Sequence, residues 1–237
     1  MSTQRRLDFE KIKDYHEKGL ISDETLRDFY DKLPLLERCV SAIERASGLS
    51  YPVIVFDPSL NLIKYPAATV SRTVIYASTK MHKLDGTFQL CVEISLPFLL
   101  YAKEDTLKAC IAHEFLHYIF NTIALSIKAF ATLSGERLDS REVHIAYDDT
   151  HTVSPEEWLD DPDLVRLVKE KFKPAIADEE LETGIKTRWI ERGMPIKIVS
   201  VEESRQSIPI LEVSKIPLDV QIINMNKAKR FFLHVGH

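Results

Sequence analysis

Residues 107–130 read LKACIAHEFLHYIFNTIALSIKAF, and this stretch determines how the rest of the chain is interpreted. Its apolar side chains fall on every side of a helical projection, which is typical of a helix buried on all faces. Asp105 is a suitable residue to cap its start and Gly135 to end it. We therefore expect a central buried helix that carries two histidines and a glutamate in its interior.

The polar residues of this helix form the pattern HExxH, with His113, Glu114 and His117. Residues four apart share one face of a helix, so both imidazoles can reach the same metal ion. Glu114 lies beside them, where it can take a proton from a metal-bound water. Two imidazoles, a third ligand and one open position suit zinc. The alternative is a pair of hydrogen-bonded core histidines, but the cost of burying these polar groups favours a metal site.

The chain before the helix predicts an α+β fold. Residues 8–48 have helical periodicity, with Ser22 as an N-cap, Pro34 as a break or kink and Gly48 as a C-cap. Short apolar or alternating runs then predict strands. These runs are Pro52–Phe56, Leu60–Tyr65 as its hairpin partner, Val70–Ala77 and Phe88–Leu96.

The second half of the chain alternates between polar stretches and short elements. Residues 136–153 are polar and predict a loop. Ser154-Pro155 and Asp161-Pro162 each place a proline at the first position of a helix. A further helix is expected over 175–192, and strands are expected at Ile196–Val201 and Val220–Ile223. The predicted organisation is an N-terminal helical segment (1–49), a core (50–194) and a strand-containing C-terminal segment (195–237).

The composition of the 237 residues is that of a globular protein, with 45% apolar and 28% charged residues. The net charge of −5 gives no reason to expect a nucleic-acid partner. The first residues lack the apolar core of a secretion signal, and no apolar run is long enough for a membrane span. Three widely spaced cysteines do not form a disulfide framework. We therefore expect a cytoplasmic protein.

The segment Ile111–His117, preceded by the alternating strand Phe88–Leu96, resembles the zincin metallopeptidases. The resemblance implies a small twisted sheet packed on the central HExxH helix, here with extra N-terminal helices. It also implies a Zn²⁺ cofactor, a peptide or protein substrate, and Glu114 as general base. In that family a strand before the metal helix forms the edge on which an extended substrate docks, a role implied here for Phe88–Leu96. The alternative is a non-catalytic zinc-binding module, regulatory or structural, that keeps the zincin fold.

The third metal ligand distinguishes the zincin subfamilies. The metzincin pattern requires a glycine and a histidine where this chain has Phe120 and Ile123, so that subfamily is excluded. The remaining choice for the third ligand is a downstream acid, as in gluzincins, or a downstream histidine. The chain resembles gluzincin-like or minigluzincin-like zincins.

A downstream segment, residues 178–184 (DEELETG), resembles the gluzincin pattern ExxAD. In this alignment Glu180 is the first residue and the implied metal ligand, with Thr183 and Gly184 in the places of Ala and Asp. Small residues there would let this helix approach the metal helix closely. Glu179 is the alternative one residue away, and two loop histidines, His144 and His151, are the other candidates.

Overall fold

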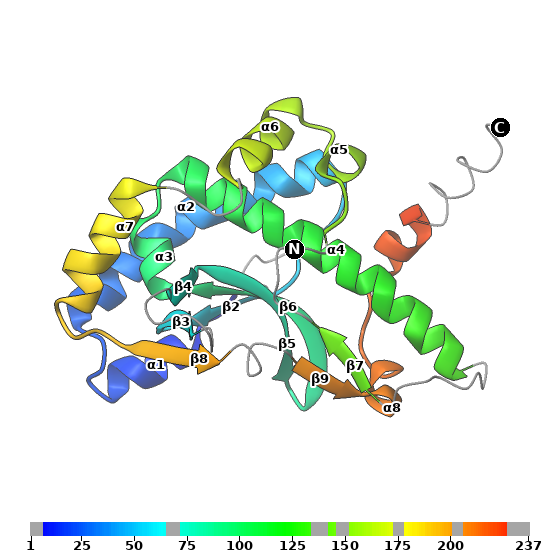
Figure 1. The fold of residues 1–237 in the computed structure, drawn as a ribbon, viewed down its shortest axis with the longest axis horizontal. Coiled ribbons are helices and arrows are strands. Elements are labelled where there is room, and N and C mark those ends of the chain that lie inside the picture. Colours follow the sequence, from blue (N-terminus) through cyan, green and yellow to red (C-terminus); the bar gives the residue numbers. More distant parts are fainter. Residues whose placement is uncertain are drawn as a thin grey trace.

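The protein has a mixed α+β architecture with several helices around small mixed sheets (Figure 1). The structure is a computed structural model, and it describes residues 7–64, 72–133, 142–145, 152–172, 178–200 and 206–226. His151 and Gly135 therefore lie outside the described residues.

The largest sheet has four strands in the order β1-β2-β6-β5. Strands β1 (Leu7–Asp8), β2 (Ile54–Asp57) and β6 (Thr87–Ser95) are parallel to one another, whereas β5 (Ala77–Leu84) runs antiparallel to β6. The parallel pairs join segments far apart in the chain, since parallel strands need a crossover connection.

Strand β6 contains the predicted run Phe88–Leu96 up to Ser95, and it lies inside the sheet rather than at its edge. Val92 is paired with Ile54 of β2 on one side and with Thr79 of β5 on the other. The expectation that this strand is the docking edge is therefore wrong. The edge strand beside it is β5, most of which the sequence patterns did not identify.

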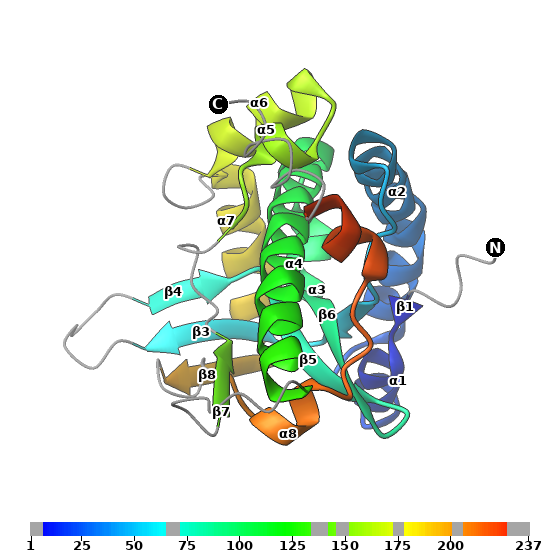
Figure 2. The same cartoon turned by 90° about the vertical axis from the view of Figure 1, so that its right-hand side faces the viewer.

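The predicted central helix is confirmed as α4 (Glu104–Leu133). It begins one residue before Asp105, which therefore lies in its first turn. It crosses one face of the four-stranded sheet, over β5 and β6 (Figures 1 and 2). Although α4 has 30 residues, no helix in the described part of the chain combines length and apolar character in the way that a membrane span requires.

The N-terminal helices are α1 (Glu10–Glu17) and α2 (Asp23–Ser47), and α2 packs against α4. The predicted N-cap is confirmed, because Ser22 accepts a hydrogen bond from the Thr25 amide at 3.2 Å. Gly48 is the predicted C-cap, with a left-handed φ of 68° that suits glycine. Of the predicted break or kink at Pro34, the break is wrong, because α2 continues through that residue.

A second sheet has the order β4-β3-β8, with β4 (Arg72–Ile75) antiparallel and β8 (Ile196–Ser200) parallel to β3 (Leu60–Lys64). The strand predicted at 196–201 is therefore confirmed. The predicted hairpin between residues 52–56 and 60–65 is wrong, because β2 and β3 belong to different sheets.

The remaining elements lie mostly in the second half of the chain. They are α3 (Leu96–Tyr101), β7 (Glu142–Ile145), α5 (Pro155–Trp158), α6 (Pro162–Lys171), α7 (Glu179–Ile185), its π-helical continuation η2 (Lys186–Ile190), β9 (Gln206–Pro209) and α8 (Ile210–Val213). β7 pairs with β9, so part of the expected loop 136–153 is a strand. Asp161 caps α6 as predicted, with its Oδ1 accepting the Leu164 amide at 3.1 Å.

The strand predicted at Val220–Ile223 is a helix instead. Its first turn is stabilised by Asp219, whose carboxylate accepts the Gln221 amide at 2.8 Å. An aspartate before such a run is a helix-start signal, and here it prevails over the strand preference of the β-branched residues.

The three predicted segments share one hydrophobic core. Ile12 from the N-terminal segment, Phe115 from α4 and Ile222 from the C-terminal segment are all fully buried in the same cluster. Burial of this cluster holds α4 between the sheet and the helices.

Candidate metal centre

His113 and His117 meet on the same side of α4, as their spacing predicts. Their Nε2 atoms lie 3.1 Å apart, and the two rings are nearly perpendicular, at 87°. The residues are only 8% and 7% exposed. Two ring nitrogens are thus held close together among buried residues.

The ring of His113 is also held from the other side by Phe172, which follows α6. The two rings are stacked, with centroids 4.0 Å apart and an interplanar angle of 11°. This contact restricts rotation of the imidazole and so contributes to the orientation of its nitrogen atoms. The sequence carried no local sign of this role for Phe172, because the residue is 59 positions downstream.

Glu114 is the third member of the motif and is held by the neighbouring edge strand. The Thr79 hydroxyl of β5 lies 2.8 Å from the Glu114 carbonyl oxygen and 3.0 Å from its carboxylate Oε2. Both residues are buried, at 4% and 5% exposure. The contact joins α4 directly to the edge of the sheet.

Behind the motif, Tyr51 supports the helix. Its hydroxyl donates a 2.8 Å hydrogen bond to the Ile111 carbonyl oxygen, and its ring stacks on Phe115 at 5.2 Å. Burial, and then the nearby Glu114 carboxylate, raise the pKa of Tyr51 well above its ordinary value. Tyr51 therefore acts as a neutral hydrogen-bond donor at this position.

The histidine pair fits a zinc ion. Zinc binds imidazole nitrogens at about 2.0–2.1 Å with tetrahedral geometry, which separates two such nitrogens by about 3.3 Å. The observed separation of 3.1 Å between the Nε2 atoms is close to that value, and it is also the length of a hydrogen bond between the two rings. The donor set is also the kind that zinc prefers.

The structure does not bring Glu180 to the histidines. Its carboxylate is paired with Lys103 at 2.8 Å, and its side chain is 70% exposed. Lys103 precedes α4, ten residues before His113, and a helix rises 1.5 Å per residue, so the pair lies on the order of 15 Å from the histidines along the helix.

The contacts of α7 explain this position. Asp178, its N-cap, accepts a 2.6 Å hydrogen bond from Thr106, two turns before His113 on α4. A Cβ atom added at Gly184 would lie 3.1 Å from Cβ of Tyr101 in α3. The small residue expected to admit the metal helix therefore admits α3.

The other candidate ligands are placed as follows. Glu179 is exposed on α7, next to Glu180. His144 is in strand β7 rather than in a loop, paired with Ser207 of β9, and His151 lies outside the described residues. Within the described ranges, no three His, Cys, Asp or Glu side chains are grouped closely enough to hold a metal ion.

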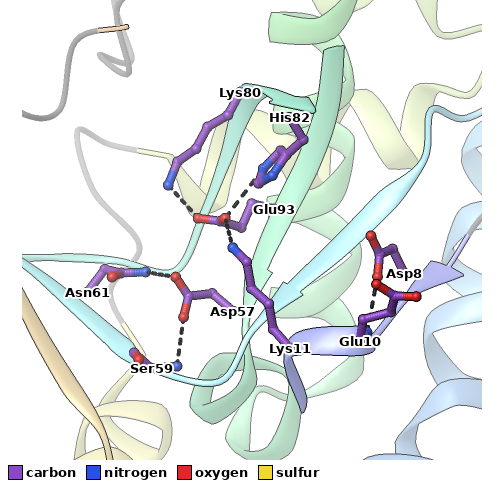
Figure 3. Close-up of polar contacts among 9 residues, drawn as sticks. All are labelled: Asp8, Glu10, Lys11, Asp57, Ser59, Asn61, Lys80, His82 and Glu93. Atoms are coloured by element: carbon purple, nitrogen blue, oxygen red, sulfur yellow. Dashed lines mark hydrogen bonds and ion pairs between the residues drawn. The ribbon is translucent and has the colours of Figure 1, made fainter. Parts of the chain in front are cut away.

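A second polar cluster lies on the sheet face opposite α4 (Figure 3). The Glu93 carboxylate is paired with Lys80, with Lys11 at 3.6 Å and with His82 at 3.4 Å. Burial alone would raise the pKa of Glu93, but these neighbours lower it below its ordinary value. Burial also lowers the pKa of His82, in spite of the adjacent Glu93. The cluster is a largely buried ion-pair network, separated from the histidine pair by the sheet.

Comparison with protein-family models, with curated proteins and with solved structures found no match for this chain. The functional argument therefore depends on the geometry of the HExxH helix and its neighbours.

Proposed function

We propose that this protein is a zinc-dependent metallopeptidase, with His113 and His117 as metal ligands. The observation that carries the proposal is the 3.1 Å separation of their Nε2 atoms, beside Glu114 in a largely buried site. A pair of histidines and a glutamate in this spacing is the arrangement used for metal-assisted hydrolysis of peptide bonds.

The residues divide the work as follows. A zinc ion bound there would lower the pKa of its bound water to about 7 and polarise the substrate carbonyl. Glu114 would accept the proton of the attacking water on its carboxylate and pass it to the leaving amine. The apolar side chains around α4 limit the access of bulk water, which strengthens electrostatic interactions in the site.

Strand β5 is the proposed docking edge for the substrate. It is the last strand of its sheet, and Thr79 places it next to Glu114. An extended peptide can add to such an edge through main-chain hydrogen bonds. These bonds orient the peptide backbone and are compatible with many different peptide side chains. This supports a peptide or an unfolded protein segment as substrate.

The test compares the wild-type protein with the variant Glu114→Gln on an unfolded protein substrate, with zinc content measured in parallel. We expect the variant to keep its zinc and its melting temperature while cleavage falls roughly 100-fold or more, the usual effect of losing a general base. Glu24→Gln, the same substitution at an exposed glutamate of α2, is the matched control and should retain full activity.

The second candidate is a zinc-binding module without catalysis, regulatory or structural. Glu180 is paired with Lys103 at the surface, and a structural zinc site is closed by four protein ligands, so a further side chain in the open position would favour the module. Wild-type protein that binds zinc but cleaves nothing, with equal behaviour of Glu114→Gln, would favour the module over the enzyme.

A further inference from the structure

The contact between Thr79 and Glu114 has a geometry that a packing contact alone does not require. One hydroxyl lies within hydrogen-bond distance of two acceptors of the same residue, the backbone oxygen at 2.8 Å and the carboxylate Oε2 at 3.0 Å. The Glu114 side chain is therefore turned back toward its own backbone and toward β5. A glutamate in a helix has several rotamers, and this contact selects one of them.

Thr79 is itself held firmly. Its backbone is paired with Val92 in the middle of the β5–β6 ladder, and the residue is 4% exposed. A β-branched side chain has few χ1 states available, so the hydroxyl position follows from the strand position. The strand register thus determines where the carboxylate of Glu114 is held.

A carboxylate has two oxygen atoms, and the contact divides their roles. The single hydroxyl hydrogen of Thr79 is shared between Oε2 and the Glu114 carbonyl oxygen, and this leaves Oε1 to take part in proton transfer. We propose that Thr79 is a positioning residue for Glu114, holding its carboxylate in the orientation needed for the general base. This inference rests on the proposed function for its catalytic meaning, whereas the contact between Thr79 and Glu114 is independent of that function.

The experiment uses the full chain with Thr79→Val, which removes the hydroxyl at nearly constant volume, and Thr79→Ser, which keeps it. Crystal structures of the metal-free wild type and both variants report the rotamer of Glu114. Steady-state kinetics report kcat and KM separately, together with zinc content. Thr122→Val makes the same substitution at another buried threonine, on α4, and leaves the Thr79–Glu114 pair intact.

In Thr79→Val we expect the Glu114 carboxylate to leave its wild-type position or to occupy several rotamers. Because a hydrogen bond to a charged group is lost, kcat should fall roughly tenfold or more, with KM and zinc content unchanged. Thr79→Ser should restore both the rotamer and kcat, and Thr122→Val should alter neither. Thr79→Ala carries the same expectation as the valine variant, so a folding defect in one leaves the other to report.

A carboxylate that keeps its wild-type position in the variants without the hydroxyl overturns the inference, whatever the activity. An unchanged kcat in these variants overturns it as well. If the wild type cleaves no substrate but the carboxylate is released in Thr79→Val, the proposed function fails while the positioning role stands.

Discussion

Lys103 Nζ lies 2.8 Å from Oε1 of Glu180, and the two side chains are 60% and 70% exposed. Glu180 of α7 lies at the surface beside Lys103, near the start of α4 and far from His113. We therefore expect Glu180→Ala to retain zinc at the chelator concentration that wild type withstands. Glu182→Ala, on the same helix, is the matched control and should behave identically.

Zinc loss in Glu180→Ala alone would instead show that α7 rearranges on metal binding and that the ExxAD alignment is right. Zinc loss in Glu179→Ala alone would move that alignment by one residue. If only His144→Ala or His151→Ala loses zinc, the third ligand is a histidine, and the gluzincin assignment falls.

Glu93 provides a stability test that is independent of the metal site. The variant Glu93→Gln leaves Lys80 without its buried carboxylate partner, and breaking such a pair costs about 3 kcal/mol of unfolding free energy. Chemical denaturation at pH 7 measures the difference. Asp14→Asn, which removes an exposed pair with Lys18, is the control and should leave the stability almost unchanged.

The same pair predicts a pH dependence. The pKa of Glu93 is lowered from 4.5 in the folded protein, so its stabilising contribution is fully present above pH 4.5 and is lost as the pH falls through the folded pKa. In a His82→Gln background, where this neighbour of Glu93 no longer titrates, the stability gap between the protein with Glu93 and Glu93→Gln should therefore be constant at higher pH and shrink below pH 4.5. A gap that widens on acidification would contradict this assignment of the charge.

Tyr51→Phe removes a hydroxyl that donates to the backbone of the metal helix and leaves the aromatic stacking in place. Loss of this buried hydrogen bond to Ile111 should lower the unfolding free energy by about 1 kcal/mol, measured by denaturant titration. Tyr101→Phe is the control, since the Tyr101 hydroxyl makes only a long, 3.4 Å contact with Arg188. Equal effects of the two substitutions would refute a supporting role for the Tyr51 hydroxyl.

Local signals predicted the helices well. The apolar run around His113 predicted α4 because a helix buried on all sides needs apolar side chains on all sides. Ser22, Gly48 and Asp161 predicted helix ends because capping depends on residues next to one another in the chain. The helix at 220–226 had such a signal in Asp219, and the β-branched run after it was the misleading feature.

Strand pairing was predicted poorly, because it depends on contacts between distant segments. β2 pairs with β1 and β6 rather than with β3, and the local sequence between β2 and β3 does not specify that choice. The sequence did not predict β5, because Lys80 and His82 interrupt its apolar pattern. Their buried partner, Glu93, is apparent only in the tertiary structure.

In the candidate site, too, the sequence predicted the local contacts but not the contacts between distant segments. The i, i+4 spacing alone predicted that His113 and His117 share a face, since one helix contains both. Thr79 and Phe172 reach the motif from other elements, and the packing of α7 places Glu180 elsewhere.

The central claim is that the histidine pair binds zinc, and metal content measured by elemental mass spectrometry on purified protein tests it most directly. We predict about one zinc per chain in the wild type and loss of that zinc in both His113→Ala and His117→Ala, with the fold retained. Wild-type protein without zinc, even after incubation with the metal, or full zinc content in both variants, would contradict the account and leave two hydrogen-bonded core histidines in place of a metal centre.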